Sequence, residues 1–121
     1  MDSVFFSKEH LWAKQDGNTV ILGISDYAKE ELGWVMFVNL PELGTEVAAG
    51  DTLGDIESVK TVSDLISPVA GTVMEVNALV IENPEIINDD PYENWLVKVS
   101  CADIPSSLMN EDDYKEYLEG L

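Results

Sequence analysis

The chain has 121 residues, of which 45% are hydrophobic, and its 24 acidic residues against 6 lysines give a net charge of −18. This length fits one domain, residues 1–121, that buries roughly two thirds of the surface exposed by the unfolded chain. The acid excess argues against a nucleic-acid partner, since phosphate binding needs cationic patches. No apolar run is long enough to span a bilayer and the first residues lack the pattern of a signal peptide, so we expect a cytoplasmic protein without a membrane partner.

Two explanations of the acid excess stay open at this point. Strong negative charge suits a protein that docks on basic partner surfaces, and it suits adaptation to high salt equally well. The single cysteine, Cys101, excludes an internal disulfide and cannot by itself build a thiolate metal cluster. We expect Cys101 to be an ordinary, partly buried residue.

The first half of the chain predicts a hairpin, a helix and a strand. Residues 11–14 and 19–24 are β-prone and flank an Asp-Gly pair, which is typical of a hairpin turn. Residues 25–33 begin with a capping serine, contain helix formers and end with glycine, which predicts a short helix. Residues 35–40 are an apolar strand that ends at proline, because proline has no N–H to continue a ladder.

The second half predicts short strands separated by turns, which favours a compact β-sandwich or barrel. Residues 83–91 are expected to be a loop with at most one helical turn. Residues 110–121 are expected to form an amphipathic helix capped by Asn110. The segments 44–47 and 71–74 are faintly alike, which is compatible with a pseudo-twofold pair of hairpins. The predicted strands are 46–48, 52–57, 61–66, 71–76 and 95–99.

Nothing in the sequence resembles a catalytic constellation. His10 lies in a strand-like run with no cysteine or second histidine to share a metal, so we expect a structural role. The abundant carboxylates are most simply a solvated surface. Core packing is expected for the large aromatic residues and is favoured over exposure at Trp34. The expected core aromatics are Trp12, Trp95, Phe37 and the pair Phe5-Phe6.

Lys60 is the remaining candidate. Two β-prone runs end at Glu57 and begin near Thr61, which places Lys60 at the tip of a tight connection. An exposed lysine is ordinarily just a solvated surface residue, so this position alone would not indicate a function. The surrounding motif changes that interpretation.

The region around Lys60 resembles the lipoyl-attachment region of glycine cleavage H-proteins. The tetrapeptide E-S-V-K ending at Lys60, the following S-D and S-P pairs, the glycine eleven residues after the lysine and the closing V-N all match. The similarity spans nearly the whole chain. Further matching segments are 23–28, 37–41, 83–88 and 90–92.

This resemblance implies a mainly β fold, a barrel-sandwich hybrid of two antiparallel sheets of the biotinyl/lipoyl-carrier type, with small peripheral helices and a C-terminal helix. It also implies a carrier without catalysis of its own, whose lipoate is attached to Lys60 by a lipoate ligase or lipoyl transferase. The chemistry belongs to the cofactor, and the protein supplies orientation and access. The implied partners are glycine decarboxylase, aminomethyltransferase and dihydrolipoyl dehydrogenase, between which the arm carries an aminomethyl group.

The neighbours of Lys60 have expected supporting roles. Val59 and Thr61 are stiff at χ1 and suit the ends of strands, so they are expected to hold the tip. Ser58 belongs to the same turn. Glu57 and Asp64 would surround the root of the arm with negative charge that a modifying enzyme could recognise, with ordinary surface charge as the alternative. The resemblance also implies that Asp64 is a polar partner of the cationic cargo.

The chain departs from the family pattern at the positions expected to line the cargo cleft. Leu11 stands where the family usually has a glutamate, and Glu9 where a small hydroxyl is frequent. Glu31 replaces a frequent histidine and Trp34 a usual acidic residue. An ammonium beside Leu11 would lose a charge partner, so these departures bear on the cargo and leave lipoylation unaffected.

Three functions are therefore weighed. The leading one is the lipoylated carrier of the glycine cleavage system. The second is an H-protein-like lipoate-binding protein that carries sulfur in a heterodisulfide-reductase-like oxidation pathway, or that relays lipoyl groups to other enzymes. The third and least favoured is an unmodified β-domain that acts only as an interaction module.

Overall fold

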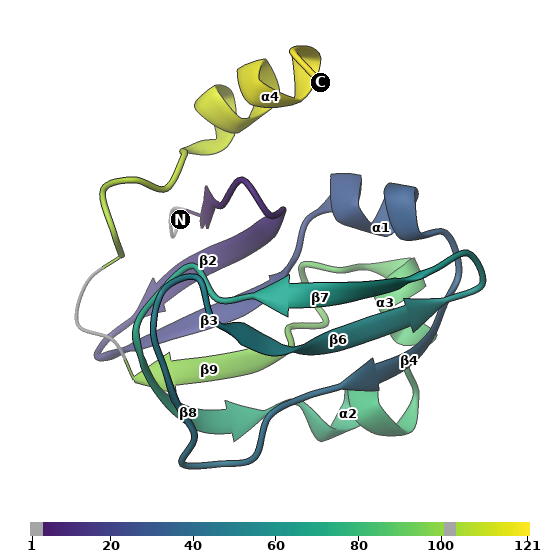
Figure 1. Cartoon of the computed structure of the whole chain (residues 1–121), viewed down its shortest axis with the longest axis horizontal. Coiled ribbons are helices and arrows are strands. Elements are labelled where there is room, and N and C mark those ends of the chain that lie inside the picture. Colours follow the sequence, from purple (N-terminus) through teal and green to yellow (C-terminus); the bar gives the residue numbers. More distant parts are fainter. Residues whose placement is uncertain (1–3, 101–103) are drawn as a thin grey trace.

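The computed structural model describes residues 4–100 and 104–121, and it contains two antiparallel sheets. The larger sheet has the strand order β1-β2-β3-β9-β8-β5, and the smaller has the order β4-β6-β7. The smaller sheet lies across the larger one (Figure 1). The strands are β1 Val4–Phe6, β2 Leu11–Asp16, β3 Thr19–Ile24, β4 Val35–Asn39, β5 Glu46–Val47, β6 Thr52–Ser58, β7 Val62–Ile66, β8 Gly71–Val76 and β9 Val97–Ser100.

The core lies between the two sheets, because alternate residues of their strands point inward. Val20 and Val99 from the larger sheet and Val38, Ile56 and Leu65 from the smaller one belong to this single buried cluster. The expected mainly β architecture of two antiparallel sheets is confirmed. The described strands form a sandwich and do not close into a barrel.

The predicted helices at residues 25–33 and 110–121 are confirmed. Helix α1 covers Asp26–Leu32, and Ser25 caps it by accepting a hydrogen bond from the backbone N–H of Ala28 at 3.2 Å. Helix α4 covers Glu111–Glu119, and Asn110 accepts the equivalent bond from Asp113 at 2.8 Å.

The segment between β8 and β9 contains two short helices. Helix α3, Ile86–Asp89, is the single helical turn that was expected. Helix α2, Ala78–Glu82, was not predicted; it has five residues and starts at the cap Asn77, whose side chain accepts a bond from Leu79. A helix this short has too few residues for a hydrophobic period to be recognised in the sequence.

Three expectations about individual side chains are wrong. His10 is not in a strand: it has a φ of 70° and lies in the turn before β2, where its N–H bonds to the Ser7 carbonyl at 3.0 Å. Phe37 is 55% exposed, because β4 is an edge strand with a register shift between Val35 and Phe37 that leaves the ring on the outer face. Trp34 is likewise 55% exposed rather than packed in the core.

Other expectations agree with the structure. Phe6 and Trp12 are buried in a second apolar cluster under α4. The two similar tetrapeptides at 44–47 and 71–74 meet in the β5–β8 pair, where Glu46 is opposite Thr72 and Val47 opposite Gly71. Cys101 lies outside the described residues.

Gly54 tests the packing of the smaller sheet. A Cβ at Gly54 would collide with the backbone carbonyl of Asn39 on β4, so Gly54→Ala must push β4 and β6 apart. We expect a loss of about 1–3 kcal/mol in the free energy of unfolding, measured with urea. Gly120→Ala is the control, because its Cβ would meet its nearest neighbour at an ordinary 3.5 Å. Equal stability of the two variants would contradict this account of the β4–β6 contact.

Candidate functional site

The tip of the β6–β7 hairpin is held by the hydroxyl of Ser58. The last paired residues are Glu57 and Val62, and the N–H of Ser58 bonds to the carbonyl of Thr61 at 2.8 Å. The Ser58 hydroxyl accepts hydrogen bonds from the N–H groups of Lys60 and Thr61, both at 3.2 Å, and donates to the Thr61 carbonyl at 3.2 Å. Ser58 is only 8% exposed, whereas Lys60 is exposed at the tip.

A second contact joins this tip to the end of α1. The N–H of Val59 donates to the carbonyl of Trp34 at 3.1 Å. Gly33 has a φ of 77°, and a Cβ built there would lie 3.2 Å from Cε of Lys60. The stem of Lys60 therefore lies across the C-terminal end of α1, and glycine at residue 33 leaves the room for it.

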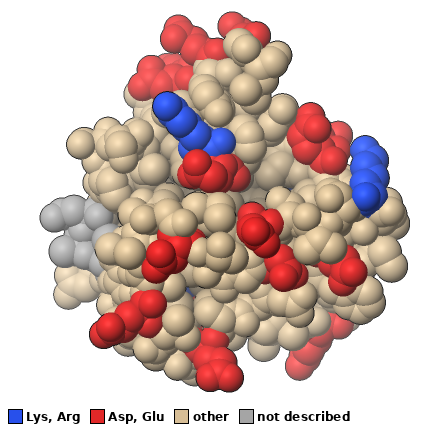
Figure 2. Space-filling view, in the orientation of Figure 1, with Lys and Arg blue, Asp and Glu red and all other residues tan. Residues whose placement is uncertain are grey.

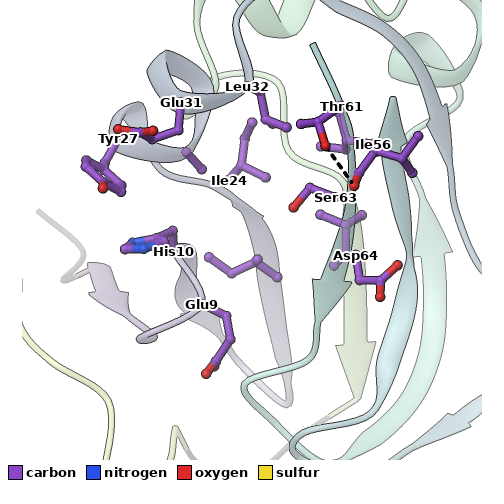
Figure 3. A pocket seen from close by; sticks show the side chains of 14 residues that line it. Glu9, His10, Ile24, Tyr27, Glu31, Leu32, Ile56, Thr61, Ser63 and Asp64 are labelled. Carbon is purple, nitrogen blue, oxygen red and sulfur yellow. Dashed lines mark hydrogen bonds between the residues drawn. The ribbon is translucent and has the colours of Figure 1, made fainter. Parts of the chain in front are cut away.

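Beside the hairpin is an open cleft of about 330 Å³. One wall comes from the turn before β2 and from α1, and the other from the β6–β7 hairpin (Figure 3). A volume of this size is at the lower end of the range for small-molecule sites. The labelled polar residues that line the cleft are Glu9, His10, Tyr27, Glu31, Thr61, Ser63 and Asp64.

His10 links the cleft to the C-terminal helix. Its Nδ1 lies 2.8 Å from the hydroxyl of Tyr114, which lies 2.8 Å from the hydroxyl of Ser25. Burial lowers the pKa of His10 below 6.5, although the charges of Glu9 and Glu31 oppose this shift. His10 is therefore mostly neutral at pH 7 and adds little positive charge beside the carboxylates of Glu9 and Glu31. Burial raises the pKa of Tyr114 to about 12, so its phenol stays protonated.

Two exposed carboxylates flank His10 along one wall. Figure 3 shows Glu31 with Tyr27 at one end of this wall and Glu9 at the other. Glu31 and Tyr27 share a face of α1 because they are four residues apart. The pKa of Tyr27 is raised, first by partial burial and then by the charge of Glu31 and a hydrogen bond to it. This wall of the cleft is thus anionic at both ends.

Leu11 belongs to the apolar base of this cleft. It lines the cleft but is only 2% exposed, and it is part of the main core cluster. Ile24 and Leu32 lie beside the cleft in the same cluster. The cleft therefore combines an apolar base with carboxylates at its rim.

The alternation of side chains along β7 decides which hairpin residues face the cleft. Ser63 stands opposite the buried Ile56, and Asp64 stands opposite Asp55 on β6. Neighbouring residues of a strand point to opposite faces. Figure 3 shows the hydroxyl of Ser63 on the same side as Glu9 and His10, and the carboxylate of Asp64 on the other side of β7. Asp64 borders the cleft without directing its charge into it.

The structure thus divides the residues singled out in the sequence into two groups. Glu9, Leu11, Thr61 and Asp64 all line or border the cleft. Glu57 and Val59 are exposed and do not line it. Sequence reasoning treated Glu31 only as a departure from a pattern and did not consider Tyr27 or Ser63. The i,i+4 spacing in α1 was the one signal that could have paired Tyr27 with Glu31.

The chemical group that the hairpin tip presents is the exposed primary amine of Lys60. In the described part of the chain no three His, Cys, Asp or Glu residues are placed to hold a metal ion. No helix among the described residues is long and apolar enough to cross a membrane. The amine of Lys60 protrudes from a rigid turn next to a cleft large enough for a small acyl group.

Two antiparallel sheets with an exposed lysine at the tip of a hairpin are the architecture that the sequence resemblance implied for a lipoyl-carrier domain. Comparisons with known proteins agree. The family model described as glycine cleavage H-protein matches residues 4–120. The chain belongs to the glycine cleavage H-protein family.

Individual relatives cover nearly the whole chain. A probable glycine cleavage system H protein of Thermococcus gammatolerans is 46% identical, with 99% of this chain and 92% of the relative aligned. A glycine cleavage system H protein of Staphylococcus haemolyticus is 49% identical over 93% of this chain and 92% of its own length. The crystal structure of a glycine cleavage system H protein from Mycobacterium marinum superposes with a TM-score of 0.90, at 36% identity and 98% coverage of both chains.

Ser58 tests how the tip is held. Ser58→Ala removes the acceptor of two backbone N–H groups in a nearly buried turn, so we expect a loss of about 1–3 kcal/mol in the free energy of unfolding. Urea unfolding measures this loss. Thr61→Val is the control, because the Thr61 hydroxyl is exposed and makes only a 3.4 Å contact with the next carbonyl. An equal loss in the control would show that the Ser58 hydroxyl has no special role.

Proposed function

We propose that Lys60 carries lipoate in amide linkage and that the chain shuttles the aminomethyl group of glycine. Its partners in this role are glycine decarboxylase, aminomethyltransferase and dihydrolipoyl dehydrogenase. The observation that carries the proposal is the position of Lys60, exposed on a hydrogen-bonded turn beside an open cleft. Family membership supports it, and so does the E-S-V-K motif around the lysine.

The chain itself provides the attachment point for lipoate and orients the resulting arm. Nζ of Lys60, once deprotonated, attacks the activated carboxyl carbon of lipoate in a ligase or transferase, and the activating group leaves as the amide forms. Bound lipoate would supply a dithiolane that accepts and releases a group through its sulfur atoms. Ser58 and the Trp34 carbonyl keep the root of the arm in one place. The stem of Lys60 starts across the end of α1, whose residues Glu31 and Leu32 line the cleft.

The carboxylates of the cleft suit a cationic cargo. An aminomethyl group carries an ammonium charge, and Glu9 and Glu31 provide negative charge at the two ends of one wall. Neutral His10 between them does not cancel that charge. We therefore assign to Glu9 and Glu31 the role that the family pattern would give to a glutamate at residue 11. Asp64 lies on the other face of β7, so we assign it only a place in the surroundings of the arm's root.

One observation favours the alternative cargo. Leu11 makes the base of the cleft apolar where the family pattern has a carboxylate, and Leu11 is too deeply buried to be replaced by a charge without cost. A sulfur cargo has no ammonium group to stabilise and suits an apolar wall. The carrier of sulfur in a heterodisulfide-reductase-like pathway is therefore the second candidate.

Lys60→Arg tests the attachment site. Arginine keeps the positive charge but has no amine that the ligase can acylate. We expect the wild-type chain to gain one lipoyl mass on incubation with ligase, ATP and lipoate, and the variant to gain none, as measured by intact mass spectrometry. Lys115→Arg, on the exposed face of α4, is the control and is expected to behave as wild type. A lipoyl mass on Lys60→Arg would show that another lysine is the site.

The cargo is tested at Glu31. If the cleft holds an ammonium group, the lipoylated Glu31→Gln variant, loaded by glycine and glycine decarboxylase, should hydrolyse its aminomethyl group several-fold faster than wild type. The reason is the lost charge attraction in a partly enclosed cleft. Hydrolysis breaks the C–S bond and releases ammonia and formaldehyde, which leaves the free thiol on the arm. Glu30→Gln is the matched control: it is the preceding residue of α1, exposed but outside the cleft. Wild-type protein that accepts lipoate but cannot be loaded would favour the sulfur carrier.

A further inference from the structure

The outer surface around Lys60 carries a group of exposed apolar side chains. Four large apolar side chains lie near the tip, and each is more than half exposed. Isolated exposed apolar residues are common, but a group of them beside a reactive site indicates an interaction surface. The four residues, which we call the tip patch, are Trp34 at 55%, Phe37 at 55%, Val59 at 63% and Val62 at 56% exposed.

Strand register places part of the tip patch in one row. Phe37 on β4 stands opposite Glu57 on β6, and Glu57 stands opposite Val62 on β7. All three side chains are exposed on the outer face of the smaller sheet, and Val62, like Asp64, also borders the cleft. The row therefore presents a carboxylate between two apolar side chains.

The backbone of Trp34 is hydrogen-bonded to the hairpin, and the backbone of the next residue is hydrogen-bonded to α3. Its carbonyl accepts the N–H of Val59 at 3.1 Å, and the next residue, Val35, donates to the side chain of Asn88 at 3.0 Å. A large ring on a fixed backbone can bind a partner at a low entropic cost, and tryptophan is among the residues that contribute most at protein interfaces. Trp34 also follows Gly33, over which the Lys60 stem lies.

We propose that the tip patch is the docking surface for the enzyme that acylates Lys60, a proposal that rests on the proposed function. The unmodified amine reaches no further from the hairpin than a lysine side chain, so the acylating enzyme must contact the surface around the turn. Enzymes that act on the far end of the completed arm do not have this constraint. The stem of Lys60 lies against Gly33, and the exposed Trp34 is the next residue of the chain.

The charge of the smaller sheet's outer face indicates what the docking surface of this enzyme must contain. Glu57 is in the middle of the row, and Asp55 and Asp64 form the next row on the same sheet. Figure 2 shows acidic side chains spread over the face formed by β6 and β7, with little lysine among them. The occupant is therefore an enzyme with an apolar depression for Trp34 and Phe37 and a cationic residue opposite Glu57.

The test measures the steady-state rate of lipoylation of the full-length apo-protein by a purified lipoate ligase with ATP and lipoate. Trp34→Ala and Phe37→Thr, the latter chosen to keep a β-forming residue, are each expected to raise the KM for the protein substrate about 5- to 10-fold and to leave kcat near that of wild type. Glu57→Gln is expected to raise KM. It should also make KM rise less steeply as the salt concentration increases. Melting temperatures verify that each variant is folded.

Matched controls come from the larger sheet. Met74→Ala removes an apolar side chain that is also 55% exposed, and Glu46→Gln removes an exposed carboxylate. Both should leave KM unchanged. The proposal is overturned if the variants at Trp34 and Phe37 match these controls, or if their effect falls on kcat alone, which would mean that they only alter the geometry of the turn. If the wild-type chain is not lipoylated at all, it is the proposed function that fails.

Discussion

The function proposed for this protein depends on the hydrogen bonds that hold a two-residue turn. The Ser58 hydroxyl binds two N–H groups of the turn, and the N–H of Val59 binds the Trp34 carbonyl at the end of α1. Together these bonds fix the root of Lys60 relative to both the smaller sheet and α1. Without them the exposed lysine would be an ordinary mobile surface residue, because hairpin ends have few packing contacts of their own.

The two faces of the smaller sheet then provide two different environments near one lysine. Ile56 and Leu65 on the inner face pack in the core, and the cleft opens at the edge where α1 and the turn before β2 approach the hairpin. The outer face carries Phe37, Glu57 and Val62. A one-residue shift of register between β6 and β7 would exchange these faces, so the same pairing determines both the cleft and the tip patch.

The distribution of charge suits both the proposed cargo and the proposed docking partner. Burial lowers the pKa of His10, so at neutral pH this side chain adds little positive charge between Glu9 and Glu31. The outer face is acidic as well (Figure 2). An excess of this kind steers basic partners toward the protein and also raises its solubility in salt, so both explanations of the −18 charge are compatible with the structure.

The sequence alone determined the family resemblance, the strands and helices with strong local signals, and the position of Lys60 at a hairpin tip. These features depend on short-range chemistry: a capping serine before α1, an Asp-Gly turn, a lysine between two β-prone runs. Tertiary structure decided the rest. Phe37 is exposed because of a register shift in an edge strand, and Trp34 is exposed just before that strand begins. His10 has a left-handed backbone in a turn, and Glu31 reaches the cleft only because α1 packs beside the hairpin. Such outcomes depend on which elements become neighbours in space, and local sequence patterns carry little information about that.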